Sequence, residues 1–348
     1  MSFSSGADGV GWRKSSLHCG ASVPPDLPPS RAVAPAEDLR LCVSAPQMSP
    51  ARVKELCELL TCWNGSSFIC RSQVERFIRM GVPASLRGRV WKCLLNTDGL
   101  RESSRFSYQR CLLEVRERLV DLGISEYSVL SAIATLSDAQ NLPPSARDHE
   151  DHIALFRQVA LDLQRSFPSH RSLMGDSPEA IEGQAKLFRV LIAYAKYNPR
   201  VGYSQGMSYI AAVLLMHLGE EEAFWALTAL LDQPKYLAQL FDLELTQVQH
   251  QVRVFEQFLR HRKPKLSQHL ESLGVVPFHF VMPWFLCLFT SLPCWDSVLL
   301  IWDLVALRGL SALFHAALTI ADLLESRLME QREEGAVLPL LLRVPVDV

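Results

Sequence analysis

Two polar side chains, Arg165 and Gln205, lie at the edges of otherwise apolar helical patterns. Neither an arginine nor a glutamine serves as acid, base or nucleophile in ordinary protein chemistry. A guanidinium can stabilise negative charge, and a carboxamide can orient a water molecule. Hydrolysis of a bound nucleoside triphosphate by a GTPase needs both tasks. These two residues are therefore the candidates for chemistry in this chain.

Arg165 ends a helical segment that also contains Val159 and Asp162. Asp162 lies three residues earlier, and this spacing places the two charged side chains on one helical face. The simpler interpretation is a surface ion pair, which contributes little to stability. The functional interpretation is that Asp162 fixes the direction of the Arg165 side chain. Phe167 and Pro168 end the predicted helix, so Arg165 falls in its last turn and can project outward.

Gln205 lies in the sequence Tyr-Ser-Gln-Gly-Met at 203–207, after the predicted break at 198–202. Tyr203 and Gln205 are thus expected at the start of a helix, where free backbone N–H groups can lie beside a phosphate. Gly206 permits close approach of another backbone. The alternative is that Gln205 is only a polar helix-capping residue.

Arg87 and Trp91 lie four residues apart on one side of a predicted helix. We interpret this pair as structural, with Trp91 as a buried anchor and the aliphatic part of Arg87 packed beside it.

These segments together resemble the three signature motifs of the TBC domain family, the GTPase-activating proteins of Rab-type small GTPases. The resemblance runs from about Val74 to near the C-terminus, and the three motifs occur in the family's order. The family usually has cysteine where this chain has Ser204. The resemblance implies that Arg165 and Gln205 are catalytic and enter the partner's nucleotide site. It assigns supporting roles to Asp162, Tyr203, Gly206, Arg87 and Trp91.

The implied function is stimulation of GTP hydrolysis by a Rab-family GTPase, and through it regulation of vesicle trafficking. The protein would act on its partner's reaction and would not be a stand-alone enzyme. GTP and magnesium would be carried by the partner, and this chain would have no cofactor of its own. The expected location is cytoplasmic, with peripheral recruitment to endomembranes through the partner as an option. The alternative from another class, a catalytically inactive Rab-binding scaffold, stays open.

Composition excludes several other classes. The formal net charge of −2 gives no excess of positive charge of the kind that binds nucleic acid. The nine scattered cysteines indicate reduced thiols, and their spacing matches no zinc site. His149 and His152 suggest a metal only superficially, because no third ligand is nearby. No glycine-rich phosphate loop of the P-loop type is present in the sequence.

The stretch from Ser272 to Trp295 is long, apolar and without Asp, Glu, Lys or Arg. Its length raises the possibility of a membrane-spanning helix. Pro277, Pro283 and Pro293 interrupt it, which suits short buried helices better. We therefore expect no transmembrane segment, and a helical membrane protein is the weakest of the alternatives.

The predicted organisation is all-α. Residues 1–48 are rich in Ser and Pro and are expected to be disordered. Residues 49–72 should form an N-terminal helix and linker, and 73–348 a two-lobed, multi-helix TBC domain. The resemblance implies further helices beyond 338–345, so a shortened C-terminal lobe is an open option. Predicted helices in the clearest segments cover 51–63, 73–79, 106–123, 125–136, 150–166, 220–231, 243–262, 264–273, 278–288, 293–307 and 310–328.

Overall fold

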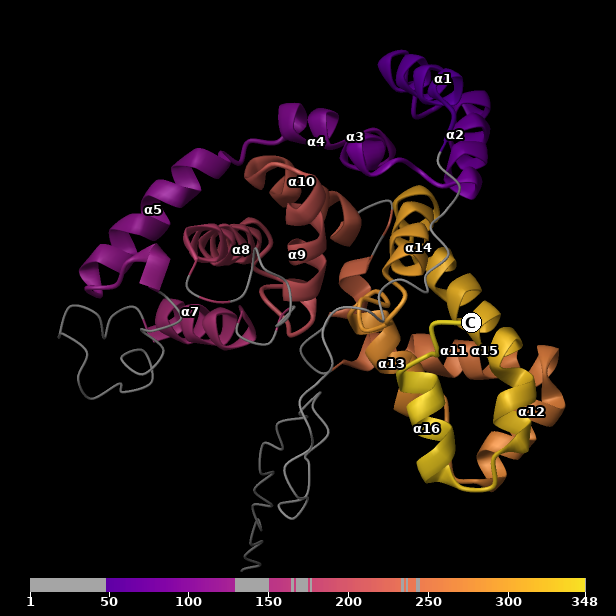
Figure 1. Cartoon of the computed structure of the whole chain (residues 1–348). Helices are drawn as coiled ribbons and strands as arrows, with labels where there is room; N and C mark the ends of the chain where they lie inside the picture. The colour runs from indigo at the N-terminus through magenta and orange to yellow at the C-terminus, as the bar shows by residue number, and fades with distance from the viewer. Residues whose placement is uncertain are drawn as a thin grey trace, which may run out of the picture. The chain divides into compact units, whose positions relative to one another are not determined.

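The computed structural model describes residues 48–128, 150–163, 166, 175, 177–232, 235, 237–241 and 245–347. These residues are mostly helical, and no strand occurs among them (Figure 1). They all belong to one compact unit that spans Arg40–Val348. The predicted disordered segment 1–48, except for Met48, lies outside the described residues, and so does most of the predicted helix 125–136.

A first group of helices surrounds α8. This helix is buried on nearly every side over its second half, because its sequence there is almost continuously apolar. It packs against α5, α7, α9 and α10. The elements that precede the second group are α1 (Pro50–Thr61), α2 (Phe68–Met80), α3 (Ala84–Leu95), α4 (Thr97–Ser103), α5 (Tyr108–Asp121), η2 (Glu126–Ser128), α7 (Glu150–Leu163), α8 (Pro178–Tyr197), α9 (Met207–His217) and α10 (Glu220–Leu231).

A second group forms around α11 and α15. The helix α11 packs on α12 and α13, and α15 contacts α12, α13, α14 and α16. The helix α3 contacts α9 and α10 of the first group and α14 of the second. Two groups of helices are thus present, and the all-α, two-lobed prediction is confirmed. The second group consists of η5 (Leu237–Leu240), α11 (Thr246–Arg262), α12 (Pro264–Ser272), α13 (Phe278–Leu286), α14 (Trp295–Arg308), α15 (Leu310–Glu330) and α16 (Glu334–Leu342).

Prolines divide the apolar stretch at 272–295, as predicted. Between the end of α12 at Ser272 and the start of α14 at Trp295 lies the short helix Phe278–Leu286, and Pro283 lies inside it. Phe280, Val281 and Trp284 are buried in the core. None of the helices in the described part of the chain is long and apolar enough to cross a membrane.

Several helix boundaries differ from the sequence prediction. The helix α2 starts at Phe68 and not at Gln73, because the Ser67 hydroxyl accepts a hydrogen bond from the Cys70 N–H and caps the helix earlier. The helices α4 and α16 were not predicted. Their sequences contain a glycine or a proline, which disfavour helix formation, and packing against α10, or against α13 and α15, compensates.

Candidate functional site

A buried hydrogen bond joins the two segments that carry the candidate residues. The Tyr203 hydroxyl donates to Asp162 Oδ2 at 2.5 Å. Asp162 is 2% exposed and Tyr203 is 6% exposed, so water competes little for this contact. Asp162 lies in the last turn of α7, and Tyr203 lies just before α9. The bond therefore holds the end of α7 against the start of α9.

A second contact strengthens the same junction. The Ser166 hydroxyl oxygen lies 2.7 Å from the Asp162 carbonyl oxygen and 2.7 Å from the Ser208 hydroxyl oxygen. Its single proton serves one acceptor, so Ser166 donates to the carbonyl and accepts from Ser208. Asp162 and Ser166 bracket Arg165, and both are buried. Arg165 lies outside the described residues, so the predicted control of its direction by Asp162 stays a prediction.

Gln205 is exposed, and its backbone is held on both sides. The Ser204 hydroxyl donates to the Phe241 carbonyl oxygen at 3.1 Å. Gly206 adopts φ 105°, and a Cβ atom there would lie 2.8 Å from the Leu286 carbonyl oxygen. Only glycine combines that backbone conformation with so close an approach. The backbone around Gln205 is thus fixed while its carboxamide faces solvent.

The turn before Gln205 is organised by Asn198, which sequence reasoning did not single out. The Asn198 carbonyl accepts hydrogen bonds from the N–H groups of Val201 and Gly202, at 3.2 and 2.9 Å. Its side-chain Nδ2 donates to Asp232 Oδ1 at 3.2 Å. Burial raises the pKa of Asp232, although the Asn198 hydrogen bond opposes the shift. The only local signal for this arrangement is the Asn-Pro pair after α8.

Arg87 and Trp91 converge on one carboxylate of the second helix group. Asp303 accepts from Trp91 Nε1 at 2.7 Å and from Arg87 Nε at 3.1 Å, and it is 0% exposed. Burial raises the pKa of Asp303 to about 6, while the Arg87 guanidinium opposes that shift. Asp303 is therefore ionised at neutral pH and pairs with Arg87. The sequence predicts a structural role for Arg87 and Trp91, but not their contacts with Asp303.

His217 completes the packing around Trp91. The two rings meet edge to face with centroids 4.9 Å apart. Burial, and secondarily the nearby Arg87, lower the pKa of His217 to about 4, so its ring is neutral at physiological pH. A Cβ on Gly88 would lie 2.2 Å from the His217 carbonyl oxygen. The glycine thus permits the close contact between α3 and α9.

Removal of the Asp303 carboxylate should destabilise the protein strongly. Asp303→Ala leaves the buried Arg87 guanidinium without its counter-ion, and such a loss costs about 3–5 kcal/mol. We expect the urea midpoint to fall accordingly. Asp296→Ala is the matched control, because Asp296 is an exposed aspartate on the same helix. Equal stabilities of the two variants would contradict a structural role for the Arg87–Asp303 pair.

Removal of the Tyr203 hydroxyl tests the junction between α7 and α9. Tyr203→Phe leaves a buried Asp162 oxygen short of one donor, which costs about 1–3 kcal/mol of folding stability. Chemical denaturation measures the loss. Tyr127→Phe, at an exposed tyrosine, should change stability by less than about 0.5 kcal/mol. A Tyr203→Phe protein as stable as the control variant would show that the hydrogen bond does not hold the junction.

Among the described residues, no cluster of three or more His, Cys, Asp or Glu side chains could hold a metal ion. Cys57, Cys62 and Cys70 are free thiols.

The model of the Rab-GTPase-TBC domain family matches residues 84–329. The chain belongs to this family. All seven candidate site residues fall within the matched range. The TBC assignment thus agrees with the three motifs read from the sequence.

Known TBC proteins show the extent of the likeness. The chain is 32% identical to mouse Carabin over 287 residues, which cover 82% of this chain and 55% of Carabin. It is 28% identical to human TBC1 domain family member 10B over 272 residues, or 78% of this chain and 29% of that protein. The chain therefore spans about half of the length of Carabin, and less of the other relative.

Two solved structures share the fold. The flagellar RabGAP TBC domain of Chlamydomonas superposes with a TM-score of 0.56 at 23% identity, covering 88% of this chain and 89% of that one. The Ypt/Rab-GAP domain of Gyp1p gives a TM-score of 0.57 at 19% identity, covering 84% and 92%. At these identities the likeness establishes a common TBC fold.

Proposed function

We propose that this protein stimulates GTP hydrolysis by a Rab-family small GTPase. The observation that best supports this proposal is the buried bond between Asp162 and Tyr203. It joins the two motif segments that contain the candidate residues: Asp162 precedes Arg165 by three positions in the sequence, and Tyr203 precedes Gln205 by two. Membership of the Rab-GTPase-TBC family supports the same function.

In the proposed mechanism, this chain supplies two side chains to the active site of the GTPase. The GTPase carries GTP and magnesium. The Arg165 guanidinium enters the nucleotide pocket and neutralises negative charge that builds on the γ-phosphate and the leaving oxygen. The Gln205 carboxamide accepts from and donates to the attacking water and so orients it. Since phosphoryl transfer depends mainly on positioning and charge stabilisation, no acid or base is needed from this chain.

The arrangement around Gln205 suits such a role. A side chain that orients water must be presented from a fixed backbone, because errors of about 1 Å in position are costly to catalysis. Ser204 and Gly206 hold that backbone against Phe241 and Leu286, as described above. The exposed carboxamide is then free to meet a partner.

The proposed partner would also place the protein in the cell. A Rab-family GTPase would draw this chain from the cytoplasm to the surface of endomembranes, and the chain would there end the GTP-bound state that directs vesicle trafficking. Flotation of the chain with vesicles that carry the GTP-loaded partner, compared with bare vesicles, tests this recruitment.

Single-turnover GTP hydrolysis across a panel of purified Rab-family GTPases tests the proposed function. At least one GTPase should hydrolyse GTP about 10³ to 10⁵ times faster with the chain than alone. Binding to a GTPase without faster hydrolysis would contradict the proposal and would favour the scaffold alternative. No binding and no stimulation across the panel would reject both.

A further inference from the structure

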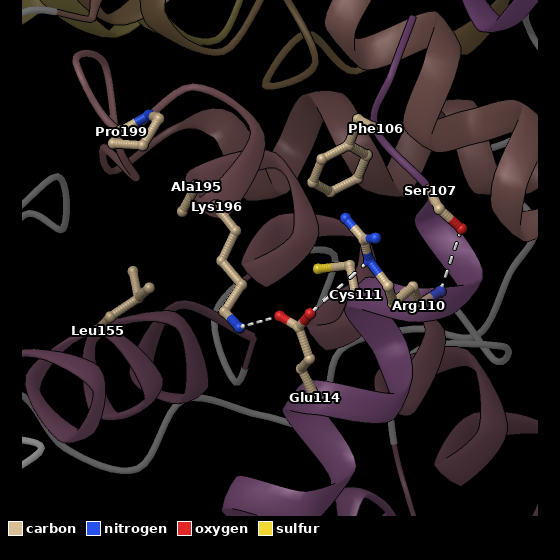
Figure 2. Close-up of a pocket in the computed structure, with 9 residues that line it drawn as sticks. All are labelled: Phe106, Ser107, Arg110, Cys111, Glu114, Leu155, Ala195, Lys196 and Pro199. Atoms are coloured by element: carbon tan, nitrogen blue, oxygen red, sulfur yellow. Dashed lines mark hydrogen bonds and ion pairs between the residues drawn. The ribbon is translucent and has the colours of Figure 1, made fainter.

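A pocket of about 440 Å³ opens between α5, α7 and the C-terminal end of α8. Its volume is within the range of pockets that accept small molecules or large side chains. Its apolar wall includes Phe106, Leu155, Ala195 and Pro199 (Figure 2). Burial raises the pKa of the Cys111 thiol to about 11, so this residue is a neutral part of the same wall.

Charged side chains surround the pocket. Lys196 Nζ lies 3.3 Å from Glu114 Oε2, and Arg110 Nε lies 3.9 Å from Glu114 Oε1 (Figure 2). The side chain of Arg110 is 74% exposed, so its ion pair is weak and easily exchanged. Arg200, next to Pro199, is exposed as well. Two cations, Arg110 and Lys196, thus line the pocket together with one carboxylate, and Arg200 follows the lining residue Pro199 in the sequence. This local positive charge contrasts with the net charge of −2 of the whole chain.

The pocket adjoins both segments of the candidate functional site. Leu155 lies two helical turns before Asp162, a separation of about 10 Å along α7. Pro199 belongs to the turn that Asn198 organises and precedes Gln205 by six residues, a span of about 20 Å at most. A specific interface buries about 800 Å² on each partner, which corresponds to a patch roughly 30 Å across. A protein bound at Gln205 can therefore extend to the pocket.

We propose that this pocket receives an apolar side chain of the GTPase, while Arg110, Lys196 and Arg200 bind a carboxylate beside it. The inference rests on the proposed function, and it adds a docking contact that determines which GTPases bind well. To match both the apolar wall and the cations beside it, the partner must present an apolar side chain and a carboxylate next to each other. A free phosphate would satisfy the cations but would leave the apolar wall exposed.

Charge substitutions with opposite expected effects test this contact. Arg110→Glu together with Lys196→Glu should raise the KM for the stimulated GTPase about 10-fold and leave kcat within about twofold, because these residues lie outside the proposed catalytic pair. Glu114→Gln should lower KM about threefold, because it removes a pocket-lining carboxylate that repels the partner's acidic group. A purely structural role for the ion pairs predicts impaired function for both variants. The measurement is stimulated GTP hydrolysis at varied GTPase concentration.

The apolar wall needs a separate variant. Leu155→Trp fills the pocket from a half-buried position and should raise KM about 10-fold. Arg52→Glu with Lys54→Glu, at exposed positions on α1, is the matched charge control and should leave KM unchanged. If the double charge variant has a lower melting temperature, Arg110→Glu alone replaces it, since this side chain is largely exposed. Added salt should raise the wild-type KM more than that of the charge variant.

The outcomes separate the two proposals. Unchanged KM in every pocket variant, with stimulation that still depends on Arg165, would overturn the docking contact and leave the proposed function intact. An increase in KM for both Glu114→Gln and the cation variants would also overturn it. Absence of stimulation by the wild-type chain across the panel would overturn both.

Discussion

Replacement of Arg165 by alanine is expected to lower the stimulated rate of GTP hydrolysis about 10³ to 10⁵-fold. An arginine supplied in trans is worth that much in rate, or roughly 4–7 kcal/mol of the barrier. Arg165→Lys should recover little of the rate. The guanidinium offers a rigid fork of donors that matches phosphate oxygens, whereas the lysine ammonium is a compact point charge.

The matched control is Arg157→Ala, which removes an exposed arginine of α7 that precedes Arg165 by eight residues in the sequence. It should leave the stimulated rate unchanged. Affinity for the GTPase loaded with a non-hydrolysable GTP analogue, measured by calorimetry, should stay within about threefold in both variants. Wild-type stimulation by Arg165→Ala would show that another group stabilises the transition state.

Replacement of Gln205 by alanine is expected to cause a comparable loss of stimulated rate. The carboxamide would orient the attacking water, and the backbone around it is already fixed by Ser204 and Gly206. Alanine at this exposed position disturbs no packing, so the melting temperature should not change. Single-turnover hydrolysis and thermal unfolding together distinguish a catalytic role from a structural one.

The control for this variant is Gln257→Ala, which removes an exposed glutamine on α11. A second test uses the partner. GTPases usually orient the water with a glutamine of their own, so a GTPase that lacks it should still be stimulated by the wild-type chain. It should not respond to the Gln205→Ala variant. Stimulation of that GTPase by Gln205→Ala would reject the proposed role.

Local sequence signals predicted much of the fold. The helix α10 follows its prediction from Glu220 to Leu231, because three glutamates at a helix N-terminus precede an apolar run. The helix α8 begins at Pro178 with Ser177 as its cap, and both residue types are local signals of a helix start. By contrast, α4 and α16 depend on packing against helices distant in the sequence, and no local pattern reports such contacts.

The site shows the same division between local and distant contacts. The close approach at Gly206 was predictable from its residue type, and the structure identifies Leu286 as the neighbour. The pairing of Arg87 with Asp303 spans 216 positions of the chain, so the sequence alone could not reveal it. The same holds for Asn198 and Asp232, which are 34 residues apart. Each contact depends on which helices the tertiary structure brings together.

Gln205 belongs to the first lobe by chain order, but its two neighbours contact the second lobe. Ser204 donates to Phe241, and Gly206 lies against Leu286. A substitution in the second lobe can therefore lower the rate of stimulated GTP hydrolysis without contacting either proposed catalytic side chain. Substitutions near the end of α13 should lower turnover before they lower affinity for the GTPase. Substitutions in the second lobe, remote from the bound nucleotide, would then have the same effect on the rate as removal of the Gln205 carboxamide.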